Sequence, residues 1–227
     1  SFSNGPKGIV TDGIVFAADA GNTQCWNPNA STSGSFNNLA NPTTGSLMND
    51  TSGSLGPGGS FIFDGTNDFI DCGNNSIFQI TGDITLSGWV YLDSYATNND
   101  HIIGKENSYI LKANQNSTSR PRFQLHDGSF KTLQGSAQLS LSTWHNVVGV
   151  KGDDVMRLYI DGVDIGSTTA YTGTTTSNSN NVYISGYDGS GAYDSDGNMA
   201  NLYIYNKALT AAEVLQNYNS QKSRFGL

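Results

Sequence analysis

The chain has 227 residues, a formal net charge of −8 and only 13% charged residues; Asn, Ser, Thr and 27 glycines supply its polarity instead. A chain this acidic, with no cluster of Lys and Arg, excludes binding through the phosphates of nucleic acid. No apolar stretch approaches the roughly 20 residues that cross a bilayer, so membrane insertion is excluded as well.

The N-terminus and the cysteines bear on the compartment. The opening stretch SFSNGPKGIVTDG has neither a basic region nor an apolar core, so no signal peptide is visible. Either processing has removed one, or the chain is an intact product that lost its initiator Met; we favour the second. Cys25 and Cys72 leave open a disulfide and two free thiols. A disulfide requires the first strand to lie near the strand that ends at Cys72.

The predicted elements begin with short strands, because hydrophobic alternation and turn residues recur along the chain. Residues 13–22 predict a first strand. A long polar loop of Asn, Ser, Thr, Gly and Pro follows over about 22–59, and we expect it at the surface, with room for short strands at 45–50. Residues 60–73 predict two short strands about an Asp-Gly turn, with Phe61, Phe63, Phe69 and Cys72 facing inward.

The stretch DITLSGWVYLD, residues 83–93, predicts a central strand, because both of its faces carry large side chains. Two hairpins follow, and Asp127-Gly128 is a favoured turn dipeptide for the second. The remaining predicted strands are three within 144–169 and one each within 181–189 and 198–209.

One helix is predicted, over about 210–219. Thr210 is a good N-cap residue, and Glu213 stands three positions later, which is the spacing of a capping box. A tail over 220–227 follows. No internal repeat or linker divides the chain, so we predict a single domain over 1–227.

Four segments, taken in order, resemble the laminin-G-like, concanavalin A-like jelly-roll superfamily. They are FDGTNDFIDCG, TLSGWVYLD, WHNVVGVKGDDVMRLYIDGVDIGS and GNMANLYIYNKALTAAEV. The resemblance covers residues 60–215 and implies an all-β, two-sheet antiparallel jelly-roll sandwich with one short C-terminal helix. The ends of the chain, IVTDGIVFAADAGN and NYNSQKSRFGL, resemble modules of structural proteins of tailed phages, especially cyanophages.

Candidate catalytic groups do not gather in the sequence. None of the three histidines, His101, His126 and His145, has a Ser or Cys nucleophile motif around it. Glycoside hydrolysis needs two neighbouring carboxyl groups. The only glutamates are Glu106 and Glu213, and the second belongs to the helix N-terminus. We therefore expect no enzyme.

Two interpretations of the aspartates stay open. Carboxylates spaced along turns are candidate calcium ligands, or they form Asx turns with the backbone. The superfamily resemblance implies a structural calcium held by an acid in the closing strand, where this chain has Ala200. That departure favours the turns. The candidate calcium ligands are Asp64, Asp68, Asp188, Asp194 and Asp196.

The resemblance also implies glycan recognition by exposed aromatic and amide side chains. The candidates are Tyr95, Asn98, Asn99, Tyr187 and Tyr193. The amphipathic tail, with Lys222, Arg224, Phe225 and Leu227, either docks onto a neighbouring subunit or packs back on its own sandwich.

We predict a non-enzymatic virion structural protein, either a capsid decoration or a tail-associated module, made in the host cytoplasm without a signal peptide. We expect a homo-oligomer that contacts other virion proteins and adheres to host-surface glycans through its loops. The alternative is a secreted carbohydrate-binding module or lectin. Neither requires a cofactor, and calcium is the one candidate.

Overall fold

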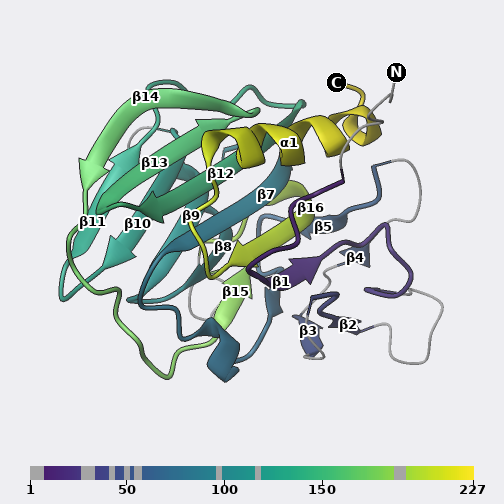
Figure 1. The fold of residues 1–227 in the computed structure, drawn as a ribbon. Coiled ribbons are helices and arrows are strands. Elements are labelled where there is room, and N and C mark those ends of the chain that lie inside the picture. Colours follow the sequence, from purple (N-terminus) through teal and green to yellow (C-terminus); the bar gives the residue numbers. More distant parts are fainter. Residues whose placement is uncertain are drawn as a thin grey trace, which may run out of the picture.

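The computed structural model describes residues 8–26, 34–40, 44–48, 52–53, 58–95, 99–115, 119–186 and 193–227. Within these ranges the chain forms two antiparallel sheets packed face to face (Figure 1). This arrangement confirms the predicted two-sheet jelly-roll sandwich.

The first sheet, called sheet I, has the order β14-β13-β12-β7-β16-β5-β4, and β1 also pairs with β16. Its strands are β1 (Ile14–Ala18), β4 (Ser52–Gly53), β5 (Phe61–Asp64), β7 (Ile84–Leu92), β12 (Trp144–Gly152), β13 (Val155–Ile160), β14 (Val163–Ala170) and β16 (Asp196–Tyr205).

The second sheet, called sheet II, has the order β11-β10-β9-β8-β15-β6-β3-β2. Its strands are β2 (Ser35–Asn37), β3 (Thr44–Met48), β6 (Phe69–Asp71), β8 (Asn99–Lys105), β9 (Tyr109–Gln115), β10 (Arg122–His126), β11 (Phe130–Gln134) and β15 (Val182–Ile184). A short 3-10 helix, η1 (Ser76–Phe78), connects β6 to β7.

The core lies between the sheets and follows from strand alternation. On β7, Leu86 and Val90 point into the main core, whereas Trp89 packs in a separate cluster on the other face. Both faces are covered, which confirms the predicted central strand. The sheets approach closely at Gly149, where an added Cβ would lie 2.5 Å from the ring of Phe123.

The predicted surface loop over about 22–59 needs correction. Part of it forms β2 and β3, which extend sheet II. The strand expected near 45–50 corresponds to β3, whereas β2 was not predicted. Trp26 and Phe36 are buried and meet Phe61 edge to face at ring distances of 6.1 and 6.0 Å. Trp26 and Phe36 therefore hold this segment against the core, although the polar residues around them predicted a surface loop.

Both cysteines are free thiols in this structure. Cys25 and Cys72 are buried in the same core cluster, so the nearness that a disulfide would require is present, but the bond is not. Burial raises the pKa of the Cys25 thiol to about 11 and that of Cys72 well above its ordinary value. High pKa values keep both groups as unreactive thiols at neutral pH.

Helix α1 (Ala211–Gln221) lies across the outer face of sheet I and leads into a 3-10 turn, η2 (Lys222–Phe225) (Figure 1). The capping box is confirmed. The backbone N–H of Glu213 donates to Oγ1 of Thr210 at 3.2 Å, and that of Thr210 donates to Oε2 of Glu213 at 2.8 Å. No helix within the described ranges is long and apolar enough to cross a membrane.

Candidate ligand-binding groove

A groove of about 280 Å³ opens on the outer face of sheet II. Strands β8 to β11 form its floor, and Tyr193, just before β16, adds to its lining. Its lining combines amides, cations, aromatic rings and one aliphatic residue, Ile110. The lining residues are Asn99, His101, Ile110, Lys112, Gln115, Arg122, Gln124, Phe130 and Tyr193.

Alternation along β10 explains two of the nine lining residues. Phe123 and Leu125 face the core, so Arg122 and Gln124 face outward. On β9, alternation alone would place Lys112 and Gln115 on opposite faces. The register shifts between the Asp100 and His101 pairings, and this bulge adds one residue to β9. Both side chains therefore reach the groove, where Nζ of Lys112 donates to Oε1 of Gln115 at 3.0 Å.

Tyr193 is held by an unusual backbone. Its φ of 73° lies in the left-handed region, which bulky residues rarely adopt. Its ring stacks on His101 at a centroid distance of 5.5 Å and an angle of 20°, and the N–H of His101 donates to its carbonyl at 3.5 Å. Burial, followed by the charge of Lys112, lowers the pKa of His101 well below its usual value. The stacked imidazole is therefore neutral at pH 7.

Two cations lie side by side in the groove. Lys112 and Arg122 are register partners on β9 and β10, and Lys112 is only 7% exposed. Burial, with a smaller contribution from Arg122, lowers the pKa of Lys112 to about 8; burial also lowers that of Arg122. In the described part of the chain, neither is in a salt bridge, and Nε of Arg122 is buried without a hydrogen-bond acceptor.

The predicted glycan-binding residues separate into three groups. Asn99 and Tyr193, far apart in sequence, are brought together in the groove. Tyr95 lies away from the groove lining, is half-buried against the core, and its hydroxyl donates to the carbonyl of Leu139 at 2.5 Å, so its glycan contact stays a prediction. Asn98 and Tyr187 lie outside the described residues.

Three of the candidate calcium ligands accept hydrogen bonds from protein groups, and two of these bonds lie within the turn between β5 and β6. Asp64 is a register partner of Asp196 and accepts from the N–H of Thr66 at 2.9 Å. Asp68 accepts from the N–H of Asp64 at 3.0 Å, and Asp196 accepts from the hydroxyl of Ser94 at 2.6 Å.

Asp194 is buried near Gly186, and Asp188 lies outside the described residues. No three His, Cys, Asp or Glu side chains converge on a metal position in the part of the chain that the structure describes. Ala200, where the relatives' acid would stand, is fully buried beside Trp89. These donors do not fit a calcium ion without the undescribed segment, so calcium stays an untested prediction.

The tail packs back on its own sandwich. The ring of Phe225 stacks on Trp89 at 4.3 Å and contacts Trp144 at 4.5 Å. Arg224 donates to both carboxylate oxygens of Asp19, at 2.8 and 2.6 Å. Lys222 lies over the ring of Tyr218, 5.4 Å from its centroid, whereas Leu227 is 47% exposed. Three of the four proposed docking residues are thus committed to intramolecular contacts.

Ser140, His145 and Asp161 are connected in the order of a hydrolytic triad. Nε2 of His145 lies 2.7 Å from Oγ of Ser140, and Nδ1 lies 2.8 Å from Oδ2 of Asp161. The other carboxylate oxygen of Asp161 accepts from the N–H of Asn146 at 2.8 Å, which ties β13 to the start of β12. Ser140 is exposed and lines neither the groove nor the cleft described next. The hydrogen bonds of His145 and Asp161 connect the end of β13 to the start of β12.

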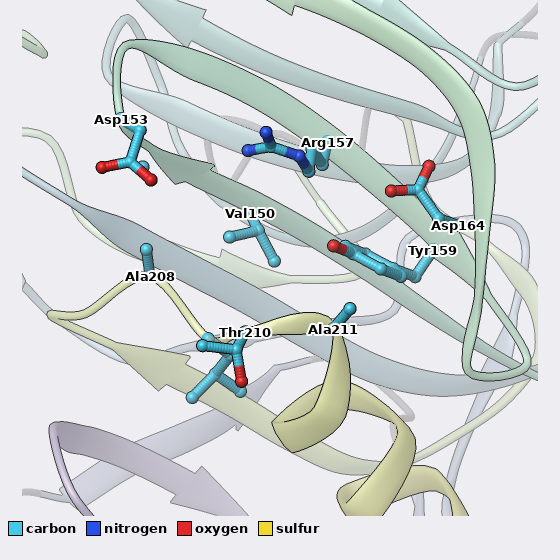
Figure 2. A pocket seen from close by; sticks show the side chains of 10 residues that line it. Val150, Asp153, Arg157, Tyr159, Asp164, Ala208, Thr210 and Ala211 are labelled. Atoms are coloured by element: carbon cyan, nitrogen blue, oxygen red, sulfur yellow. The ribbon is translucent and has the colours of Figure 1, made fainter.

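A second cleft, of about 310 Å³, lies on the opposite side of the sandwich, between β12, β13 and β14 of sheet I and the start of α1. Figure 2 shows the guanidinium of Arg157 between the carboxylates of Asp153 and Asp164, above the ring of Tyr159. This cleft therefore holds its own counter-charges.

Sequence reasoning missed seven of the nine groove residues, among them Lys112, Gln115, Arg122 and Gln124. The alternation in RFQLH, residues 122–126, was sufficient to place Arg122 and Gln124 on an outer face. Lys112 and Gln115 carried no such signal, because their common face depends on the bulge.

The family described as the concanavalin A-like lectin/glucanases superfamily matches residues 64–215. No curated protein sequence matches the chain. Among solved structures, the binding domain of Paraclostridial Mosquitocidal Protein 1 is similar, with 14% identity and a TM-score of 0.72, over 92% of this chain and 52% of that one.

Two further structures are similar. A Trypanosoma rangeli sialidase mutant with trans-sialidase activity has 18% identity and a TM-score of 0.70, over 95% of this chain and 34% of that one. Domain 4 of AbnA, a GH43 extracellular arabinanase from Geobacillus stearothermophilus in complex with arabinotriose, has 14% identity and a TM-score of 0.68, over 90% and 98%. Identities this low show the fold alone. The chain spans about half of the toxin domain and about a third of the sialidase.

Proposed function

This chain belongs to the concanavalin A-like lectin/glucanases superfamily, and from that premise we propose that it is a non-enzymatic carbohydrate-binding domain whose ligand lies in the groove on sheet II. The observation that carries the proposal is the lining of the groove. Tyr193 and Phe130 offer aromatic surfaces for the apolar faces of a sugar, and Asn99, Gln115 and Gln124 offer amide donors and acceptors for hydroxyls.

The fold relatives support this proposal without deciding it. Domain 4 of AbnA is a whole domain of this size, and its structure contains arabinotriose. The toxin relative is likewise a binding domain. Because fold does not imply function, the weight rests on the groove of this chain. Concave sites with a few convergent polar groups are where proteins usually hold small ligands.

A glycan array with the wild-type chain tests the proposal, followed by titration of the strongest binder. Tyr193→Ala and Gln124→Ala are expected to weaken binding at least tenfold, since each removes a contact that the ligand uses. Leu215→Ala is the control, because Leu215 is exposed on α1 over the other sheet. Binding that survives both groove substitutions would refute this site.

The role of the domain in its assembly is a separate part of the proposal. We also propose, from the resemblance of the chain ends described in the sequence analysis, a capsid decoration or tail-associated module with glycan adhesion at its surface. Mass spectrometry of purified virions tests that role. A secreted lectin, the alternative, would be absent from virions and present in the medium.

A further inference from the structure

We propose that the groove selects a sugar that carries a negatively charged substituent, a carboxylate or a sulfate, over its neutral counterpart. This inference rests on the proposed carbohydrate binding and specifies its ligand class. The observation behind it is the pair of neighbouring cations, Lys112 and Arg122, on the floor of the groove.

The pair is unfavourable in the free protein. Register partners on adjacent antiparallel strands direct their side chains to the same face, so the two positive charges lie close together. Burial weakens the screening of their repulsion by water and removes part of the hydration of Lys112, which is 7% exposed. A fold gains nothing from this arrangement, whereas an anion placed between the two groups relieves it.

The protein supplies no counter-charge of its own at this position. Apart from the two cations, the groove is lined by amides, a neutral imidazole, Ile110 and aromatic rings. Within the described ranges, Lys112 and Arg122 are in no salt bridge, although the chain as a whole is acidic. Elsewhere the same chain pairs Arg224 with Asp19 through two hydrogen bonds.

The geometry of the two groups suits an oxyanion. A guanidinium offers parallel N–H donors that match the oxygens of a carboxylate or sulfate, and Nε of Arg122 still lacks an acceptor. Lys112 adds a point charge from the neighbouring strand, and Gln115 holds its Nζ at 3.0 Å. The amide side chains and Tyr193 then contact the sugar ring that carries the charged substituent.

A neutral sugar would meet an energetic penalty here. It would cover Lys112 and Arg122, remove water from them and provide only partial dipoles in return. The anionic analogue supplies the missing charge at the same site. The groove therefore discriminates between a charged sugar and a neutral sugar of similar shape.

The experiment compares trigalacturonic acid with its trimethyl ester by calorimetry, because esterification removes the three charges and adds only one methyl group to each carboxylate. An array of neutral, uronate-containing, sialylated and sulfated glycans is probed in parallel, which distinguishes carboxylate from sulfate ligands. The variants are Lys112→Gln and Arg122→Gln. Arg157→Gln is the matched control, since it removes a cation from the cleft on sheet I.

We expect the bound glycans to be anionic, and each groove variant to bind them at least tenfold more weakly, with Arg157→Gln unchanged. Neutral glycans that bind as tightly as their charged counterparts, and that lose affinity in Tyr193→Ala, would overturn this inference and leave the proposed function standing. Failure of every glycan on the array to bind would overturn both.

Discussion

The outer faces of the two sheets differ in the partners of the cations that lie there. Sheet I is covered by α1 and the tail, and two cations of this cover form salt bridges, Arg224 with Asp19 and Lys207 with Asp12 and Glu213. Sheet II leaves Lys112 and Arg122 together without a carboxylate. The pair on sheet II is the one for which we propose an anionic ligand.

The largest expected effect concerns the covered face. Phe225→Ala removes the ring that fills the space between Trp89 and Trp144, and we expect a loss of about 3 kcal/mol in the free energy of unfolding. Chemical denaturation measures it. Leu227→Ala, at the exposed end of the same tail, is the control and should change little. Equal effects would show that the tail does not dock as described.

On the open face, we expect the opposite sign. Lys112→Met removes a charge that burial and Arg122 disfavour, so the variant should be more stable at pH 7 by on the order of 2 kcal/mol. Lys131→Met, on the exposed part of β11, is the control. A destabilised Lys112→Met would mean that the ammonium supports the fold.

The same group gives a pH dependence. Below pH 8 the folded and unfolded chains both keep the Lys112 proton, and the folded state bears the full cost of burying the charge. Between about pH 8 and the ordinary value of 10.5, the unfolded chain binds more protons, so wild-type stability rises with pH. Lys112→Met should reduce this slope. Part of the slope should remain in this variant, because burial also lowers the pKa of Lys105 to about 8.

A smaller effect tests the backbone at the edge of the groove. Tyr193→Gly and Tyr193→Ala both lose the ring, but only glycine adopts a φ of 73° without strain. We expect the glycine variant to be more stable than the alanine variant by about 1 kcal/mol. Both should lose ligand binding equally. Equal stability would mean that the backbone relaxes when the ring is removed.

The smallest effect is expected from calcium. Because Asp64, Asp68 and Asp196 already accept hydrogen bonds from protein groups, chelation followed by millimolar calcium should leave the melting temperature within about 1 °C. Differential scanning calorimetry measures the change. A rise of several degrees would show a calcium site that includes residues outside the described ranges, such as Asp188.

The sequence predicted much of the fold because that information is local. Alternation located β7 and the hairpins of β8 to β11, and the Thr210–Glu213 spacing located the start of α1. The groove was predicted only at Asn99 and Tyr193. Lys112 and Gln115 share a face through a bulge whose position depends on pairing with β8, which no single strand encodes. Trp26 and Phe36 were missed for a related reason, since their burial depends on Phe61.

The covered face has an optical consequence. Two of the three tryptophans, Trp89 and Trp144, lie in the cluster that Phe225 closes, and none lines the groove. Tryptophan fluorescence, excited selectively, should therefore report release of the tail and not a sugar entering the groove on sheet II. A spectrum recorded during each titration can thus distinguish a variant that has lost its ligand from one that has begun to unfold.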